Sequence, residues 1–217
     1  DRCDEIIAGE PDRYYRPNQY ENPHNPGTHE RTTAREIWTQ TGGRVTHFVG
    51  GVGTGGTVTG TGRGLHALGD VTVVGFEPAE ALHAIDGLKF LRSGDHYRPA
   101  MYDESVLDEK VYVETGAAYD RARGLRDRYR DRRLRVTDPG QYDLETVRRH
   151  LRVRTAAGDD LLVGTSSGAG IEAVHRLAST EAFAEEDVVV LVLADRGDKY
   201  ADIPLWDHLF DRAVPGD

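Results

Sequence analysis

The chain has 217 residues, 38% hydrophobic and 29% charged, as is typical of soluble globular proteins. Its formal charge of −10 argues against general nucleic-acid binding, and no apolar run is long enough to span a membrane. The single cysteine, Cys3, excludes an internal disulfide and favours a cytoplasmic location. The nine histidines include no pair with convincing metal-ligand spacing, so no metal site is predicted.

The first half of the chain alternates between loop, helix and strand patterns. Residues 1–30 are polar, with a stretch rich in Pro, Asn and Gly, and predict a loop. A helix is expected before Gly42-Gly43, with Thr32 or Thr33 as its cap. Short apolar runs at 45–50 and 71–78 predict strands, with a helix between them at 57–69.

The second half continues this alternation. We expect a strand at 110–114, helices at 117–135 and 143–153, and a strand, turn and helix over 160–180. The clearest strand covers 186–195, which is apolar throughout and therefore predicted to be buried on both faces. The polar tail beyond it offers Trp206 and Phe210 as anchors. Alternating strands and helices indicate an α/β protein with a mostly parallel sheet.

The stretch GGVGTGGTVTG, residues 50–60, contains six glycines between a strand and a helix. Glycine lets an external group approach the backbone, and the free amides of a helix N-terminus bind anions, usually phosphate. The hydroxyls of Thr54 and Thr57 can add hydrogen bonds. The alternative is a tight connection without a ligand. Residues 51–56 also satisfy G-x-G-x-x-G, with Glu77 roughly where a ribose-binding acid belongs, so a dinucleotide site stays open.

Three stretches in the same order resemble the cysteine synthase/cystathionine β-synthase family of pyridoxal-phosphate enzymes, fold type II, tryptophan synthase β-like. NQYENPHNP (18–26) is similar to the family's Q-[FY]-x-N-P-x-N segment, THFVGGVGTGGTVTG (46–60) to its phosphate-binding strand and loop, and LLVGTSSGAG (161–170) to the turn that faces the pyridine nitrogen. The resemblance implies a three-layer α/β fold, with a mostly parallel twisted sheet and helices on both faces.

Carried over by position, the resemblance implies pyridoxal 5'-phosphate as cofactor. Its phosphate would be held by Gly53, Thr54, Gly55, Gly56 and Thr57. Ser166 would hydrogen-bond the pyridine nitrogen and leave it unprotonated; alone, Ser166 is also consistent with a helix N-cap. Gln19 and Gly87 would face the substrate, although each could be an ordinary loop residue.

Two features of the family have no counterpart here. The S-x-K-x-R stretch that carries the Schiff-base lysine is absent, as is the loop that grips the substrate carboxylate. None of Lys89, Lys110 and Lys199 lies in a matching motif, so no catalytic residue is assigned. The family's closing Pro-Asp-Ser-Gly reads Ala-Asp-Arg-Gly at 194–197, and 135–158 looks like an insert.

We therefore expect the C-terminal part of a longer enzyme, with 1–30 as the end of a missing N-terminal region and linker and 31–217 as the phosphate-binding domain. The family implies a homodimer that makes cysteine from O-acetylserine, or a similar activated serine, and sulfide. This chain alone would be inactive, because the activating amine is missing. Alternatives are cystathionine β-synthase or serine/threonine dehydratase chemistry and, in another class, a non-catalytic phosphate- or nucleotide-binding module.

Overall fold

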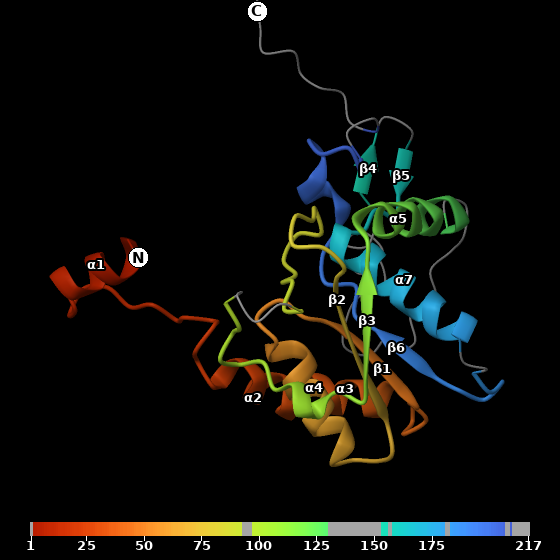
Figure 1. Cartoon of the computed structure of the whole chain (residues 1–217), viewed down its shortest axis with the longest axis horizontal. Helices are drawn as coiled ribbons and strands as arrows, with labels where there is room; N and C mark the ends of the chain where they lie inside the picture. The colour runs from red at the N-terminus through yellow and green to blue at the C-terminus, as the bar shows by residue number, and fades with distance from the viewer. Residues whose placement is uncertain are drawn as a thin grey trace, which may run out of the picture.

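A four-stranded parallel sheet forms the centre of the computed structural model (Figure 1). The structure describes residues 2–92, 97–129, 153–155, 158–180, 183–206 and 209. The strand order is β3-β2-β1-β6, and every neighbouring pair is parallel. The strands are β1 (His47–Gly51), β2 (Thr72–Pro78), β3 (Glu109–Val113) and β6 (Val189–Leu191).

Helices cover both faces of this sheet. Helices α3 (Thr33–Gln40) and α4 (Gly56–His66) pack on one face, and α5 (Thr115–Tyr129) and α7 (Thr165–Thr180) pack on the other (Figure 1). Side chains alternate between these faces, because successive residues of a strand point in opposite directions. Phe48 thus lies in the α3/α4 core and Val49 in the α5/α7 core, both fully buried. The expected three-layer α/β fold is confirmed.

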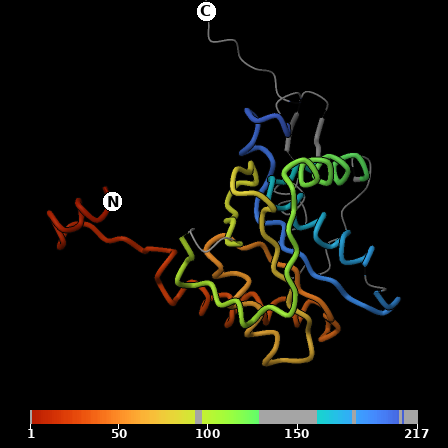
Figure 2. Tube along the Cα trace, in the orientation of Figure 1, coloured from red at the N-terminus to blue at the C-terminus, as the bar shows by residue number. Residues whose placement is uncertain are grey.

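The N-terminal segment is more helical than its composition predicts. Helix α1 (Arg2–Gly9) and all but the last residue of α2 (His24–Arg31) fall in the predicted loop 1–30, so that prediction is wrong for these residues. Helix α1 buries no residue and projects from the body (Figure 2), whereas α2 packs against α4. The division at residue 30 falls inside α2, and the two-part domain organisation stays a prediction.

The predicted strand at 186–195 is wrong in length and in burial. Only Val189–Leu191 pair in the sheet, and all three are half-buried. Val192 and Leu193 are 36% and 44% exposed. Within the described residues β6 is the edge strand of the sheet and has a paired strand on one side only, although Val190 still packs on the α3/α4 core and Val189 and Leu191 pack on the α5/α7 core.

The region before α7 also differs from expectation. Residues 161–164 form only an isolated bridge, Val163 with Arg196, rather than a strand. A separate antiparallel pair, β4 (Val153–Thr155) and β5 (Gly158–Asp160), precedes it. The helix predicted at 143–153 lies outside the described residues except for Val153, and so does most of the 135–158 segment.

Two short 3-10 turns complete the described chain, η1 (Glu104–Val106) and η2 (Gly197–Tyr200). Trp206 is fully buried, and its indole Nε1 donates a hydrogen bond to the carbonyl of Val163 at 2.9 Å. The prediction that Trp206 anchors the tail is therefore confirmed, while Phe210 lies outside the described residues. The described helices include none with the length and apolar character needed to cross a membrane.

Candidate functional site

The glycine-rich turn connects the end of β1 to the start of α4. Gly55 precedes the helix with φ +82°, a left-handed conformation that favours glycine. A Cβ at Gly55 would also lie 2.4 Å from Cβ of Tyr102, which is too close. The turn therefore requires glycine here for its backbone conformation and for its packing against Tyr102.

Other glycines of the turn are crowded by the protein's own chain. A Cβ at Gly53 would lie 2.4 Å from the carbonyl oxygen of Gly87, and one at Gly56 would lie 2.1 Å from Oδ1 of Asn25. The glycines predicted either an external ligand or a tight connection without one. The structure shows close packing within the protein, because the N-terminal segment and the loop around Gly87 lie directly on the turn.

Side chains from α2 hold the two threonine hydroxyls of the turn. Asn25 Nδ2 donates to Thr54 Oγ1 at 3.1 Å, and Thr57 Oγ1 lies 3.1 Å from His29 Nε2. The other ring nitrogen of His29 lies 2.9 Å from Thr33 Oγ1. Burial lowers the pKa of His29, partly offset by the charge of Glu36, and so favours the neutral imidazole. Sequence reasoning missed both partners, because contacts between residues about 28 apart leave no local pattern.

A cavity of about 300 Å³ brings most of the predicted site residues together. Its lining includes Gly53, Thr54, Gly55 and Thr57 of the turn, Gly87 of the loop, and Ser166 in the first turn of α7. Gly56 lies behind this lining, where its amide donates to Thr54 Oγ1 at 3.3 Å. The exposed Gln19 does not line the cavity, and its carbonyl oxygen instead accepts a hydrogen bond from Asn25.

The cavity also has a charged wall that the sequence analysis did not assign. Asp195, Lys199 and Tyr200 line it, together with Asp86. The hydroxyl of Tyr200 donates to Asp195 Oδ2 at 2.6 Å. These residues follow β6, so they lie at the carboxyl end of a parallel strand, where ligands bind in such sheets.

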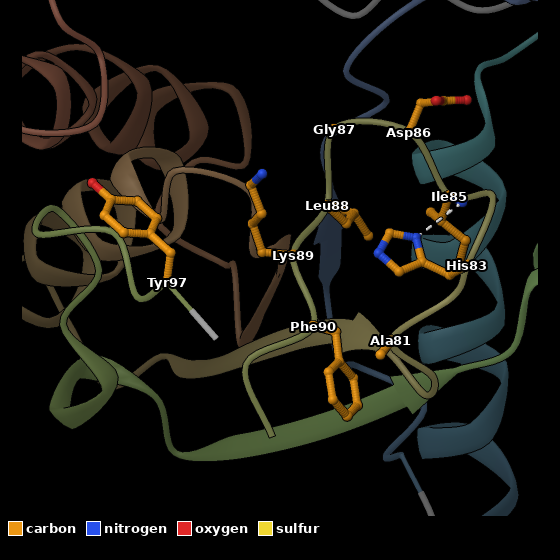
Figure 3. Close-up of a pocket in the computed structure, with 9 residues that line it drawn as sticks. All are labelled: Ala81, His83, Ile85, Asp86, Gly87, Leu88, Lys89, Phe90 and Tyr97. Atoms are coloured by element: carbon orange, nitrogen blue, oxygen red, sulfur yellow. Dashed lines mark hydrogen bonds between the residues drawn. The ribbon is translucent and has the colours of Figure 1, made fainter. Parts of the chain in front are cut away.

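Residues 81–90 form a loop that passes over the turn and borders a second cavity of about 470 Å³ (Figure 3). Gly87 forms its bend, with φ +81°. The amide of Asp86 donates to Thr165 Oγ1 at 2.9 Å, and the amide of Lys89 donates to the carbonyl of Val52 at 2.8 Å. The loop is thus hydrogen-bonded to the glycine-rich turn before α4 and to the start of α7, which both line the first cavity.

Glu77 forms an ion pair inside the protein, so its carboxylate is not available to a ligand. Its side chain is 1% exposed, and Oε1 lies 2.9 Å from Lys110 Nζ. Its other oxygen accepts a hydrogen bond from the amide of Leu91 at 3.1 Å. Burial alone would lower the pKa of Lys110, but hydrogen bonds to Glu104 and Glu77 raise it overall. Glu77 therefore cannot serve as the acid that binds a ribose, and the interpretation of the turn as a dinucleotide site loses this support.

Among the described residues, no group of three or more His, Cys, Asp or Glu side chains could hold a metal ion. The lysines differ in their surroundings. Lys199 lines the first cavity with its side chain 67% exposed, whereas Lys110 is held by two carboxylates.

A parallel α/β sheet whose strand-to-helix turns meet at one cavity is the architecture of proteins that bind small molecules at strand carboxyl ends. A family model described as pyridoxal-phosphate dependent enzyme matches residues 1–195. The chain belongs to this family of pyridoxal-phosphate dependent enzymes, and the expected resemblance is confirmed.

The relatives named below are cysteine synthases and similar enzymes. The chain is 37% identical over 204 residues to the cysteine synthase of Aquifex aeolicus, covering 93% of this chain and 53% of that protein. It is 35% identical over 184 residues to cysteine synthase B of Escherichia coli, covering 84% and 49%. The chain thus spans about half the length of the curated relatives it matches.

Solved structures give the same result. A crystal structure of O-ureido-L-serine synthase superposes with a TM-score of 0.70 at 28% identity, covering 99% of this chain and 58% of that chain. O-acetyl serine sulfhydrylase isoform 3 from Entamoeba histolytica also gives 0.70, at 29% identity, covering 97% and 55%.

Proposed function

We propose that this chain forms the cofactor-phosphate half of a cysteine synthase-like enzyme. The whole protein would convert O-acetylserine, or a similar activated serine, and sulfide into cysteine and acetate. The observation that carries the proposal is the convergence of the 53–57 turn and Ser166 on one cavity of about 300 Å³. The names of the relatives supply the reaction class.

The residues present fit pyridoxal 5'-phosphate. The turn offers backbone amides at the start of α4 and two threonine hydroxyls to a phosphate, and both threonines line the cavity. Ser166 offers a hydroxyl that has no partner among the described residues. When bound, the cofactor supplies an electron sink for bond cleavage at an amino-acid substrate.

The chain's own residues would then position the cofactor and enclose it in the cavity. Thr54 and Thr57 bind the phosphate, with Asn25 and His29 fixing their hydroxyls. The loop through Gly87 covers the cavity and limits the access of water. None of the three lysines lies in the family's reactive motif, so the activating amine would come from outside this sequence. We infer a cytoplasmic homodimer for the whole protein, which sedimentation and cell fractionation would test.

The first test compares pyridoxal phosphate with pyridoxal, which lacks the phosphate, in fluorescence titrations of the 217-residue chain. Tighter binding of the phosphate form, lost in Thr54→Val, supports the proposal. Equal binding of both contradicts it. Binding of neither compound would contradict the proposal and favour the alternative, a non-catalytic phosphate- or nucleotide-binding module.

The second test uses the product of the complete reading frame that contains this sequence. Cysteine formed from O-acetylserine and sulfide supports the proposed reaction. Conversion of serine and homocysteine, or deamination of serine alone, would assign the alternative chemistries.

A further inference from the structure

The bend of the 81–90 loop lies directly against the glycine-rich turn. A Cβ at Gly53 would lie 2.4 Å from the carbonyl oxygen of Gly87, and a Cβ at Gly51 would lie 2.8 Å from Cδ2 of Leu88. Asp86, Gly87 and Leu88 all line the first cavity, so the bend forms part of its wall. Movement of the bend away from the turn would therefore open the cavity on this side.

Two backbone amides fasten the bend, one on each side of Gly87. The amide of Asp86 donates to Thr165 Oγ1 at 2.9 Å, and the amide of Lys89 donates to the carbonyl of Val52 at 2.8 Å. The second bond joins two backbone groups, so it does not depend on which side chains are present. The first bond requires a hydroxyl at position 165. Thr165 thus supplies an anchor of the bend that a substitution can remove.

Thr165 acts on the loop and not on a ligand. It is fully buried and is absent from the lining of the cavity, although the next residue, Ser166, belongs to that lining. An amide that loses its acceptor inside the protein is left unsatisfied, whereas in an open loop it would bond to water. The hydroxyl of Thr165 therefore favours the position of the bend in which Asp86 lies against the start of α7.

The Thr165 hydroxyl is oriented by a second partner. Burial is the main cause of the raised pKa of Tyr200, and a hydrogen bond with the Thr165 side chain acts against this rise. That direction means that Thr165 donates to the phenol oxygen, because a donor stabilises the phenolate. Tyr200 in turn donates to Asp195 Oδ2 at 2.6 Å. With its proton directed at Tyr200, the Thr165 oxygen keeps a lone pair for the amide of Asp86.

We propose that Thr165 is a positioning residue that holds the 81–90 loop closed over the cavity beside Ser166. Because Thr165 and Ser166 are consecutive, the start of α7 supplies both a hydroxyl that lines the cavity and the hydroxyl that fastens its cover. Loss of the Thr165 hydroxyl should let the bend leave the turn more often, and a bound cofactor should then dissociate faster. The effect on the cofactor rests on the proposed function, whereas the effect on the loop does not.

Hydrogen exchange of single amides, followed by NMR of the 217-residue chain without cofactor, tests the effect on the loop. Thr165→Val removes the hydroxyl with little change of shape. The decisive amide is that of Lys89, because its own bond to Val52 is untouched by the substitution. It should exchange about 2–12 times faster, the factor expected from the loss of one hydrogen bond that holds a locally opening segment. Thr165→Ser keeps the hydroxyl and should retain slow exchange.

Thr115→Val is the matched control. Thr115 Oγ1 accepts a hydrogen bond from the amide of Ala84 at 3.1 Å, in the part of the loop before the bend. Its loss should leave the exchange of the Lys89 amide unchanged. An unchanged Lys89 amide in Thr165→Val, or an equal acceleration in Thr115→Val, would overturn the inference. If Thr165→Val does not fold, the wild-type chain decides. One opening should free the amides of Asp86 and Lys89 together and give them equal protection, and much stronger protection of Lys89 would contradict the role of Thr165.

The dissociation rate of pyridoxal phosphate, measured by stopped-flow fluorescence, tests the effect on the cavity. Thr165→Val should raise this rate by a factor similar to that for the Lys89 amide, and Thr165→Ser and Thr115→Val should not. An unchanged dissociation rate beside faster exchange of Lys89 would show that the loop does not cover the bound cofactor and would overturn that part of the inference. A wild-type chain that does not bind pyridoxal phosphate would contradict the proposed function, while the exchange experiment would still decide whether Thr165 holds the loop.

Discussion

Asn25 reaches from α2 to the glycine-rich turn, where its side-chain amide donates to Thr54 Oγ1 at 3.1 Å and to the carbonyl of Gln19 at 2.8 Å. One side chain thereby ties two segments of the N-terminal region to the proposed phosphate site. The contact thus holds the NQYENPHNP stretch against the glycine-rich stretch.

Asn25→Ala should lower the free energy of unfolding by about 1–3 kcal/mol, since two hydrogen bonds of about 0.5–1.5 kcal/mol each are lost. It should also weaken pyridoxal phosphate binding, because Thr54 is no longer oriented. Urea unfolding and a fluorescence titration measure the two effects. Asn22→Ala is the matched control, because among the described residues the side chain of Asn22 bonds only within the 17–24 segment. Equal loss of cofactor affinity in both variants would contradict the proposed role of Asn25.

Gly60 sits where α4 meets α2, and a Cβ there would lie 2.0 Å from the carbonyl oxygen of Pro26. Gly60→Ala should therefore destabilise the protein by about 1–3 kcal/mol through overpacking. Gly124, in the exposed interior of α5, has no atom within 4 Å of a built Cβ, so Gly124→Ala should stabilise by about 0.5–1 kcal/mol. Thermal unfolding of the two variants should give shifts of opposite sign, and shifts of the same sign would refute the close-packing account.

Lys110 neutralises the buried Glu77. Lys110→Met should cost about 3–5 kcal/mol, because it leaves a carboxylate that is 1% exposed without its ion-pair partner. Glu104→Gln removes the other carboxylate bound by Lys110, which is 43% exposed, and should cost under about 1 kcal/mol. Denaturant titrations compare the two variants. Similar losses of unfolding free energy in both variants would mean that the burial of Glu77 does not determine the cost of removing its ion-pair partner.

Local patterns predicted the centre of the fold well. The apolar runs and the glycines between them placed β1, α4 and β2 within three residues of their observed ends. The failures have physical causes. Helix α2 has weak local helix signals and packs closely against the glycines of α4, while the apolar run around β6 carries no information on whether a strand pairs with it on each side.

The candidate site was predictable where its residues share a motif. Five of the predicted residues in the turn and at Ser166 line one cavity, since small residues at strand ends mark such turns. His29, Asp195 and Tyr200 could not be found in this way. Each acquires its place through contacts that only the folded chain creates, and a single sequence records no such pairing.

The half-buried His29 should make stability depend on pH near neutrality. Its pKa is lowered from 6.5 in the folded protein, so the unfolded chain binds the proton more readily. The contribution of neutral His29 to the free energy of unfolding is therefore fully present above pH 6.5. It falls as the pH decreases toward the folded pKa, by at most about 1.4 kcal/mol per pH unit for one histidine. His83, whose pKa burial also lowers, contributes in the same direction. Carboxylates with a lowered pKa, such as Glu172, change the pH dependence of stability only below about pH 4.5.

Urea unfolding at pH 7.5 and 5.5 checks this prediction. His29→Gln keeps a polar side chain but does not titrate, so it should reduce the stability difference between the two pH values. His83→Gln should reduce it independently, because the two histidines lie in separate parts of the fold. The exposed His24, for which His24→Gln is the control, should have no effect. A pH dependence that survives in the His29→Gln/His83→Gln double variant would assign the titration to another group.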